Sequence, residues 1–101
     1  MTLTSGIELP VDRIAAVCRR YEVKELAVFG SAVRGHLRSD SDIDVLVEFK
    51  PTARIGILKF ASLAEELETL LGRSVDLVTK QGLKPWVRSS VLREARLVYA
   101  A

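Results

Sequence analysis

The sequence predicts an α/β fold: a mixed sheet of three or four strands, with helices packed mainly on one face. Three observations favour it. Short apolar runs at residues 24–29, 43–49 and 74–79 have the length of strands. Amphipathic stretches at residues 10–21, 57–71 and 84–95 alternate with these runs and carry apolar side chains at helical spacing. With 101 residues the chain can form one modest core, so we expect a single domain over residues 1–101.

The first half of the chain is expected to form a helix, a strand and a loop. Pro10 suits the first turn of the helix at residues 10–21, whose apolar face is Val11, Ile14, Cys18 and Tyr21. The strand at residues 24–29 is apolar enough to be central. A loop at residues 32–41 then begins with a short helix. The lone Cys18 is read as a small buried hydrophobe and not a nucleophile, because no histidine accompanies it.

The second half repeats the alternation of strand and helix. A strand at residues 43–49 leads to the helix at residues 57–71, which Gly72 is well placed to end. The acids Glu65, Glu66 and Glu68 of this helix are expected to face water. After the strand at residues 74–79, Pro85 lies in the first turn of the helix at 84–95, and residues 97–99 add a short final strand.

Composition excludes several classes of protein. Hydrophobic residues make up 49% and charged residues 28%, as in ordinary globular domains. The net charge of +2 gives no support for nucleic-acid binding. No apolar run approaches the length of a membrane span, and residues 1–9 do not resemble a signal peptide. One cysteine cannot form an internal disulfide, so we expect a reduced, cytoplasmic setting.

Two acids, Asp42 and Asp44, are expected to sit inside the second strand, where Asp is disfavoured, so a site is the better explanation for the pair. Side chains alternate along a strand, so Asp42 and Asp44 point the same way, with Cα atoms roughly 6–7 Å apart. Their repulsion calls for a positive partner, and a hard divalent cation such as Mg²⁺ takes oxygen ligands and leaves open positions for phosphate. Asp40 precedes the apolar alternation and is read as a turn residue.

The step from the first strand into the loop suits a phosphate. Gly30 allows a tight turn or a close backbone approach to a ligand, and Ser31 offers a hydroxyl and an amide. The spacing matches neither the P-loop nor the dinucleotide fingerprint. Arg34 can neutralise phosphate charge, whereas Arg38 and the lone His36 are read as solvated loop residues.

These residues together carry a resemblance to a known family. Gly30-Ser31, ten residues, then Asp42-x-Asp44 resembles the motif of the DNA polymerase β-type nucleotidyltransferases. Arg34-Gly35 extends the likeness to the minimal nucleotidyltransferases (MNT), which are small stand-alone catalytic domains. Many are antitoxins encoded beside HEPN-domain toxins. The resemblance covers nearly the whole chain, and it implies the minimal polymerase β-type fold.

The resemblance also implies a mechanism and a partner. Asp76 lies where the family has its third carboxylate, so Asp42, Asp44 and Asp76 would hold two Mg²⁺ ions and carry catalysis. Asp76 would also help to deprotonate the acceptor. Gly30, Ser31 and Arg34 would bind the phosphates of ATP, and AMP would pass to a tyrosine hydroxyl of a HEPN toxin and silence it.

Alternatives stay open at this point. Asp76 can instead cap a turn or pair with a nearby arginine. The protein can be an antitoxin that neutralises its partner by binding alone, or a nucleotidyltransferase acting on a small molecule. The segment around Trp86 and Arg88 is a candidate docking surface, although a core position for Trp86 fits equally well. The base preference and the homo- or hetero-oligomeric state are not determined by the sequence.

Overall fold

The computed structural model describes residues 1–35 and 37–101, so the prediction for His36 lies outside the described residues. The elements, in chain order, are α1 (Val11–Arg20), β1 (Val23–Phe29), α2 (Ser31–Arg34), β2 (Ile43–Phe49), α3 (Ile57–Leu71), β3 (Val75–Thr79), α4 (Pro85–Glu94) and β4 (Arg96–Ala100). The predicted order of helices and strands is confirmed, with differences of one or two residues at several ends.

The strands form one four-stranded mixed sheet in the order β3-β2-β1-β4. β1 is antiparallel to both β2 and β4, and β2 is parallel to β3. Parallel neighbours need a crossover connection, which α3 supplies. The predicted α/β fold with a mixed sheet is therefore confirmed.

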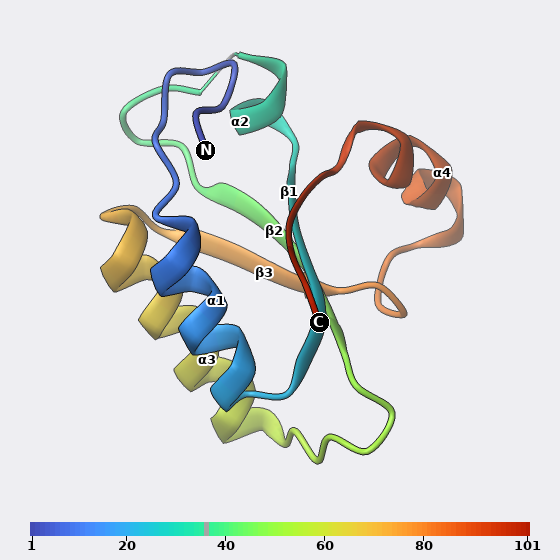
Figure 1. Ribbon diagram of the computed structural model, residues 1–101. Coiled ribbons are helices and arrows are strands. Elements are labelled where there is room, and N and C mark those ends of the chain that lie inside the picture. Colours follow the sequence, from blue (N-terminus) through green and yellow to red (C-terminus); the bar gives the residue numbers. More distant parts are fainter. Residues whose placement is uncertain (36) are drawn as a thin grey trace.

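The main core lies between the sheet and the pair α1 and α3, which run side by side over one face (Figure 1). Odd-numbered residues of β2 point into this core, where Ile43, Val45 and Val47 are fully buried. They pack with Leu63 and Leu67 of α3 and with the buried face of α1. Cys18 belongs to this core with no exposed surface, as predicted.

The opposite face of the sheet carries α4, which lies on the other side of the strands in Figure 1. Its core is a small cluster of Ala27, Leu46, Leu83 and Val91. Val91 is the one buried residue of α4, so this helix is held by little apolar surface. Trp86 is 74% exposed, which makes a core position for it wrong.

Two of the acids of α3 that were expected to face water, Glu66 and Glu68, are partly exposed and also make hydrogen bonds. Glu66 accepts hydrogen bonds from Arg20 and from the hydroxyl of Tyr21, which tie α3 to α1. Glu68 accepts from the backbone N–H of Val75 at 2.9 Å, at the start of β3. Glu65 is exposed as expected. Among the described residues, none of the helices combines the length and apolar character that crossing a membrane would require.

Candidate active site

Asp44 is the second residue of β2, and the alternation of that strand decides where it points. Ile43 and Val45 on either side are buried against α1 and α3, so the side chain of Asp44 faces the α4 side of the sheet. It is partly buried there. Burial, and then the negative charges of Asp76 and Asp42, raise the pKa of Asp44 above its usual value, while Arg34 opposes the shift. Asp44 is thus a carboxylate that needs positive charge nearby.

Asp76 is the direct neighbour of Asp44 across the parallel pair β2–β3. Adjacent strands lie about 4.8 Å apart, so the two side chains leave the sheet side by side on the same face. Asp76 is exposed. The ion pairs found among the described residues involve other acids, which gives no support for a purely structural pairing of Asp76 with an arginine.

Asp42 lies one residue before β2 and is exposed, so the expectation that it sits inside the strand is wrong. The loop before it is instead held by the segment that opens β3. Arg73 donates to the carbonyls of Arg38 at 2.8 Å and of Ser41 at 3.4 Å, and Ile43 N–H donates to Ser74 at 2.9 Å. Asp42 still lies close enough to Asp44 to raise its pKa.

The oxygen chemistry of these three acids fits a hard divalent cation. Within residues 1–35 and 37–101, however, no three acidic, histidine or cysteine side chains converge tightly enough to form a ready-made metal site. Two of the acids, Asp42 and Asp76, are exposed, so packing does not hold their carboxylates in place. A bound cation would offset the burial of Asp44 and the repulsion from Asp76 and Asp42, which together raise the pKa of Asp44.

Gly30 links β1 to α2 in a conformation reserved for glycine, with φ 74° and ψ −150°. A Cβ atom built on it would lie 2.0 Å from Oδ2 of Asp44. The close approach predicted for Gly30 is therefore present, but the group it accommodates is the carboxylate of Asp44. Ser31 follows as the first residue of α2 and is partly buried.

A glutamate that the sequence did not point to joins this loop. Glu94, the last residue of α4, accepts the backbone N–H of Gly30 at 2.9 Å. It also accepts from Nη1 of Arg34, at 3.0 Å and 2.9 Å to its two oxygens. Glu94 is 64 positions from Gly30 and 60 positions from Arg34 in the chain, so no local sequence pattern indicates the contact.

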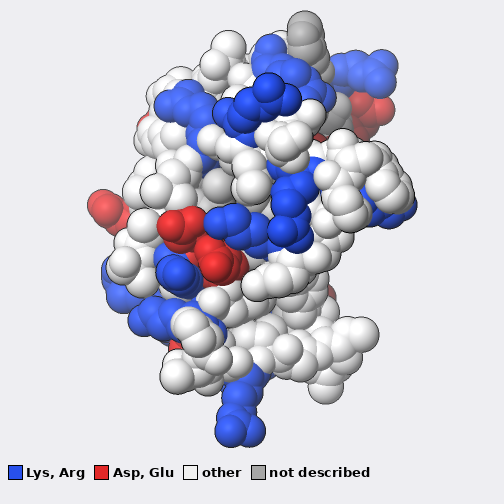
Figure 2. All heavy atoms as spheres, turned by 90° about the vertical axis from the view of Figure 1, so that its right-hand side faces the viewer, with Lys and Arg blue, Asp and Glu red and all other residues white. Residues whose placement is uncertain are grey.

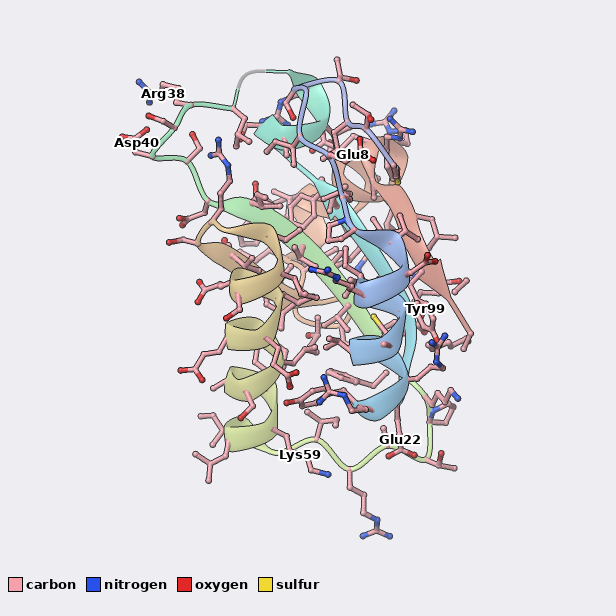
Figure 3. The ribbon with its side chains drawn as sticks, turned by 60° about the vertical axis from the view of Figure 1, so that its left-hand side comes forward. Glu8, Glu22, Arg38, Asp40, Lys59 and Tyr99 are labelled. Carbon is pink, nitrogen blue, oxygen red and sulfur yellow. The ribbon has the colours of Figure 1, made fainter. Side chains whose placement is uncertain are left out.

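The α4 side of the sheet carries acidic and basic side chains together, among them Glu48 of β2 with Lys24 and Lys80. Figure 2, which looks at the α4 side, shows acidic side chains gathered near the centre with Lys and Arg on both sides. Arg38 and Asp40 stand apart. Both are exposed and point outward from the loop before β2 in Figure 3, which agrees with their predicted roles as solvated and turn residues.

Comparison with known proteins gives the family. The nucleotidyltransferase domain model matches residues 13–98. The protein adenylyltransferase MntA of Thermococcus cleftensis is 51% identical over 75 residues, which are 74% of each chain. A solved structure of a candidate minimal nucleotidyltransferase is 42% identical, with a TM-score of 0.72 over 85% of this chain and 86% of that one.

A more distant likeness concerns the fold alone. A complex of a tri-AMPylated Shewanella oneidensis HEPN toxin with an MNT antitoxin contains a chain that is 20% identical, with a TM-score of 0.63, over 90% of this chain and 70% of that one. The domain match begins within α1 and ends within β4, and it includes all the motif residues. This chain therefore belongs to the nucleotidyltransferase domain family and is a nucleotidyltransferase.

Proposed function

We propose that this protein transfers AMP from ATP to a tyrosine hydroxyl of a HEPN-domain toxin and thereby acts as its antitoxin. The observation that carries the proposal is the side-by-side placement of Asp44 and Asp76, with Asp42 near them and the Gly30 loop directly against Asp44. The name and 51% identity of the archaeal adenylyltransferase support AMP as the group transferred. The HEPN toxin complex of a distant structural relative supports the choice of partner.

We assign phosphate binding and metal binding to different residues of the site. Gly30, Ser31 and Arg34 would bind the phosphates, since backbone N–H groups and a guanidinium are strong donors to phosphate oxygens. Two Mg²⁺ ions held by Asp42, Asp44 and Asp76 would supply the positive charge that stabilises the attacking oxygen and the departing pyrophosphate. The half-buried Asp44 would anchor the site, because its two neighbours in β2, Ile43 and Val45, are buried in the core.

The transfer itself forms one bond and breaks one. The acceptor oxygen bonds to the α-phosphorus, the bond from that phosphorus to the pyrophosphate oxygen breaks, and the hydroxyl proton leaves to a base. Asp76 is our candidate base, because it is exposed on the site face and lies beside Asp44.

The acceptor is proposed to arrive on another macromolecule. A domain of this size uses its helices and sheet for its own core and keeps little surface for a small-molecule pocket. The exposed Trp86 and Arg88 on α4 offer a docking surface on the same side of the sheet as the acids. We place this reaction in the cytoplasm.

The test is to incubate the protein with a HEPN protein encoded beside it, ATP and Mg²⁺, and to weigh the partner by intact-mass spectrometry. We expect the mass of one or more AMP groups on the wild-type reaction, and none with Asp42→Asn/Asp44→Asn. Peptide mapping should place AMP on tyrosine. A partner that is silenced without a change in mass would make this protein an antitoxin that acts by binding.

A further inference from the structure

Glu94 contacts Gly30 and Arg34, two of the residues that are proposed to bind phosphate. This contact is here called the Glu94 clasp. Glu94 takes the backbone N–H of Gly30 and both of its oxygens lie within 3.0 Å of Nη1 of Arg34. Its side chain is 26% exposed and that of Arg34 is 54% exposed. The clasp therefore engages the same donors that the proposed function gives to ATP.

Carboxylate and phosphate compete for such donors. Both are anions with paired oxygens, and a guanidinium binds either of them through charge-assisted hydrogen bonds. A triphosphate placed beside Asp44 also meets Glu94 as a like charge, because the negative charge of Glu94 reaches Asp44. The two anions therefore compete for the N–H of Gly30 and for Nη1 of Arg34.

We propose that Glu94 is a built-in competitor of the nucleotide: it occupies Gly30 and Arg34 in the empty enzyme and must leave when the triphosphate binds. This proposal rests on the proposed function for the identity of the ligand. It gives Glu94 a positioning role, since the clasp keeps Arg34 folded over the loop until phosphate replaces the carboxylate.

The fold allows Glu94 to leave at low cost. Glu94 is the last residue of α4, and the chain is already extended at Ala95. Val91 is the only buried residue of α4. A hydrogen bond from Arg88 to the carbonyl of Lys80, at 3.2 Å, also attaches the helix to the rest of the domain. Rotation of one side chain, or a small shift of the last turn of α4, is enough to open the clasp.

The experiment measures binding of tripolyphosphate and of a non-hydrolysable ATP analogue, both with Mg²⁺, by calorimetry. Glu94→Gln keeps the shape of the side chain and removes its charge, so both ligands should bind roughly two- to fivefold more tightly, the range expected for a partly exposed ion pair. Glu66→Gln is the matched control. Its ion pair with Arg20 has similar exposure and lies on the other face of the sheet, so the affinities should not change.

A double-mutant cycle separates the clasp from a simple loss of negative charge. In an Arg34→Gln background, Glu94→Gln should give a smaller further gain, because the guanidinium is gone and only the N–H of Gly30 is still shared. An equal gain in both backgrounds would overturn the clasp, as would equal affinity of wild type and Glu94→Gln. So would failure of tripolyphosphate to bind either protein.

A direct readout follows the carboxyl carbon of Glu94 and the amide of Gly30 by NMR. Tripolyphosphate should shift the Glu94 carboxyl signal toward that of a free glutamate, and an unmoved signal at saturation would overturn the proposal. If this exchange occurs but the HEPN partner gains no AMP, the clasp stands and the proposed function fails. If the partner is AMPylated while Glu94→Gln binds both ligands as wild type does, the clasp fails alone.

Discussion

Gly30 leaves no room for any side chain between itself and Asp44, because a Cβ on Gly30 would lie 2.0 Å from Oδ2 of that carboxylate. The loop proposed to bind phosphate and the strand that carries the central acid are therefore packed as one unit. A substitution at Gly30 should act on the site through Asp44, even before any ligand is considered.

Gly30→Ala is expected to displace the Asp44 carboxylate and to reduce AMP transfer strongly. Gly72→Ala is the matched control: Gly72 also has a positive φ, of 66°, but a Cβ there meets nothing within 4 Å. The control should lose only the backbone cost, about 1–2 kcal/mol in the free energy of unfolding, and keep its transfer rate. Urea denaturation and the transfer assay measure the two effects. Wild-type transfer by Gly30→Ala would contradict the packing argument.

The charge on Asp44 should make the metal-free protein lose stability as pH rises. Its pKa is raised in the folded state from an unfolded value of 3.8. A raised pKa means that the folded protein holds the proton more tightly, so this contribution is full below the unfolded value and disappears as pH rises through the folded one. Wild type should therefore fall behind Asp44→Asn in melting temperature between about pH 4 and neutrality, measured in EDTA.

Mg²⁺ should reverse that difference. A cation that binds only the folded wild type raises its melting temperature, and the rise grows with the logarithm of the Mg²⁺ concentration above the dissociation constant, whereas Asp44→Asn should respond less. Asp44→Asn could instead be less stable than wild type in EDTA at neutral pH. That result would show that repulsion among Asp42, Asp44 and Asp76 does not reduce the stability of the metal-free protein.

Cys18 should be inert in the native protein. It has no exposed surface, and burial raises the pKa of its thiol to about 12. The thiolate is the reactive form, so iodoacetamide at pH 8 should leave the folded protein unmodified. Intact mass after treatment in guanidinium chloride, where one group should add, is the control. Rapid alkylation of the native chain would contradict the burial of this helix face.

The fold was predictable because its signals are local. α3 was predicted at both ends, since Gly56 and Gly72 flank its apolar repeat and Gly72 adopts the left-handed conformation that ends a helix. The placement of Asp44 followed from strand alternation between Ile43 and Val45. That Asp76 belongs beside it came from the family resemblance, and the parallel register of β2 and β3 agrees.

The features that could not be predicted depend on contacts between residues far apart in the sequence. Glu94 reaches Gly30 only because β4 returns along β1 and brings the end of α4 to the loop. The role of Glu66 likewise needs the packing of α1 against α3. Trp86 was ambiguous because the apolar pattern of α4 is weak, and with one buried residue in the helix no strong face decides which way the indole points.

The exposed indole of Trp86 leads to the last prediction, on partner binding. At 74% exposure it contributes little to the core, so Trp86→Ala should change the free energy of unfolding by no more than about 0.5 kcal/mol. Leu63→Ala, at a fully buried site of α3, should cost about 2–5 kcal/mol in the same measurement. Exposed tryptophans are frequent anchors of interfaces, so Trp86→Ala should weaken binding to the HEPN partner by about 2 kcal/mol or more.

The control for exposed apolar surface in general is Ile57→Ala. Ile57 is 85% exposed at the start of α3, far along the molecule from α4 in Figure 1. Calorimetric titration of the partner should find wild-type affinity for this variant and a loss for Trp86→Ala. Equal losses would mean that the partner contacts no defined surface around Trp86 and Arg88. No loss in either variant, with AMP transfer intact, would move the docking surface off α4.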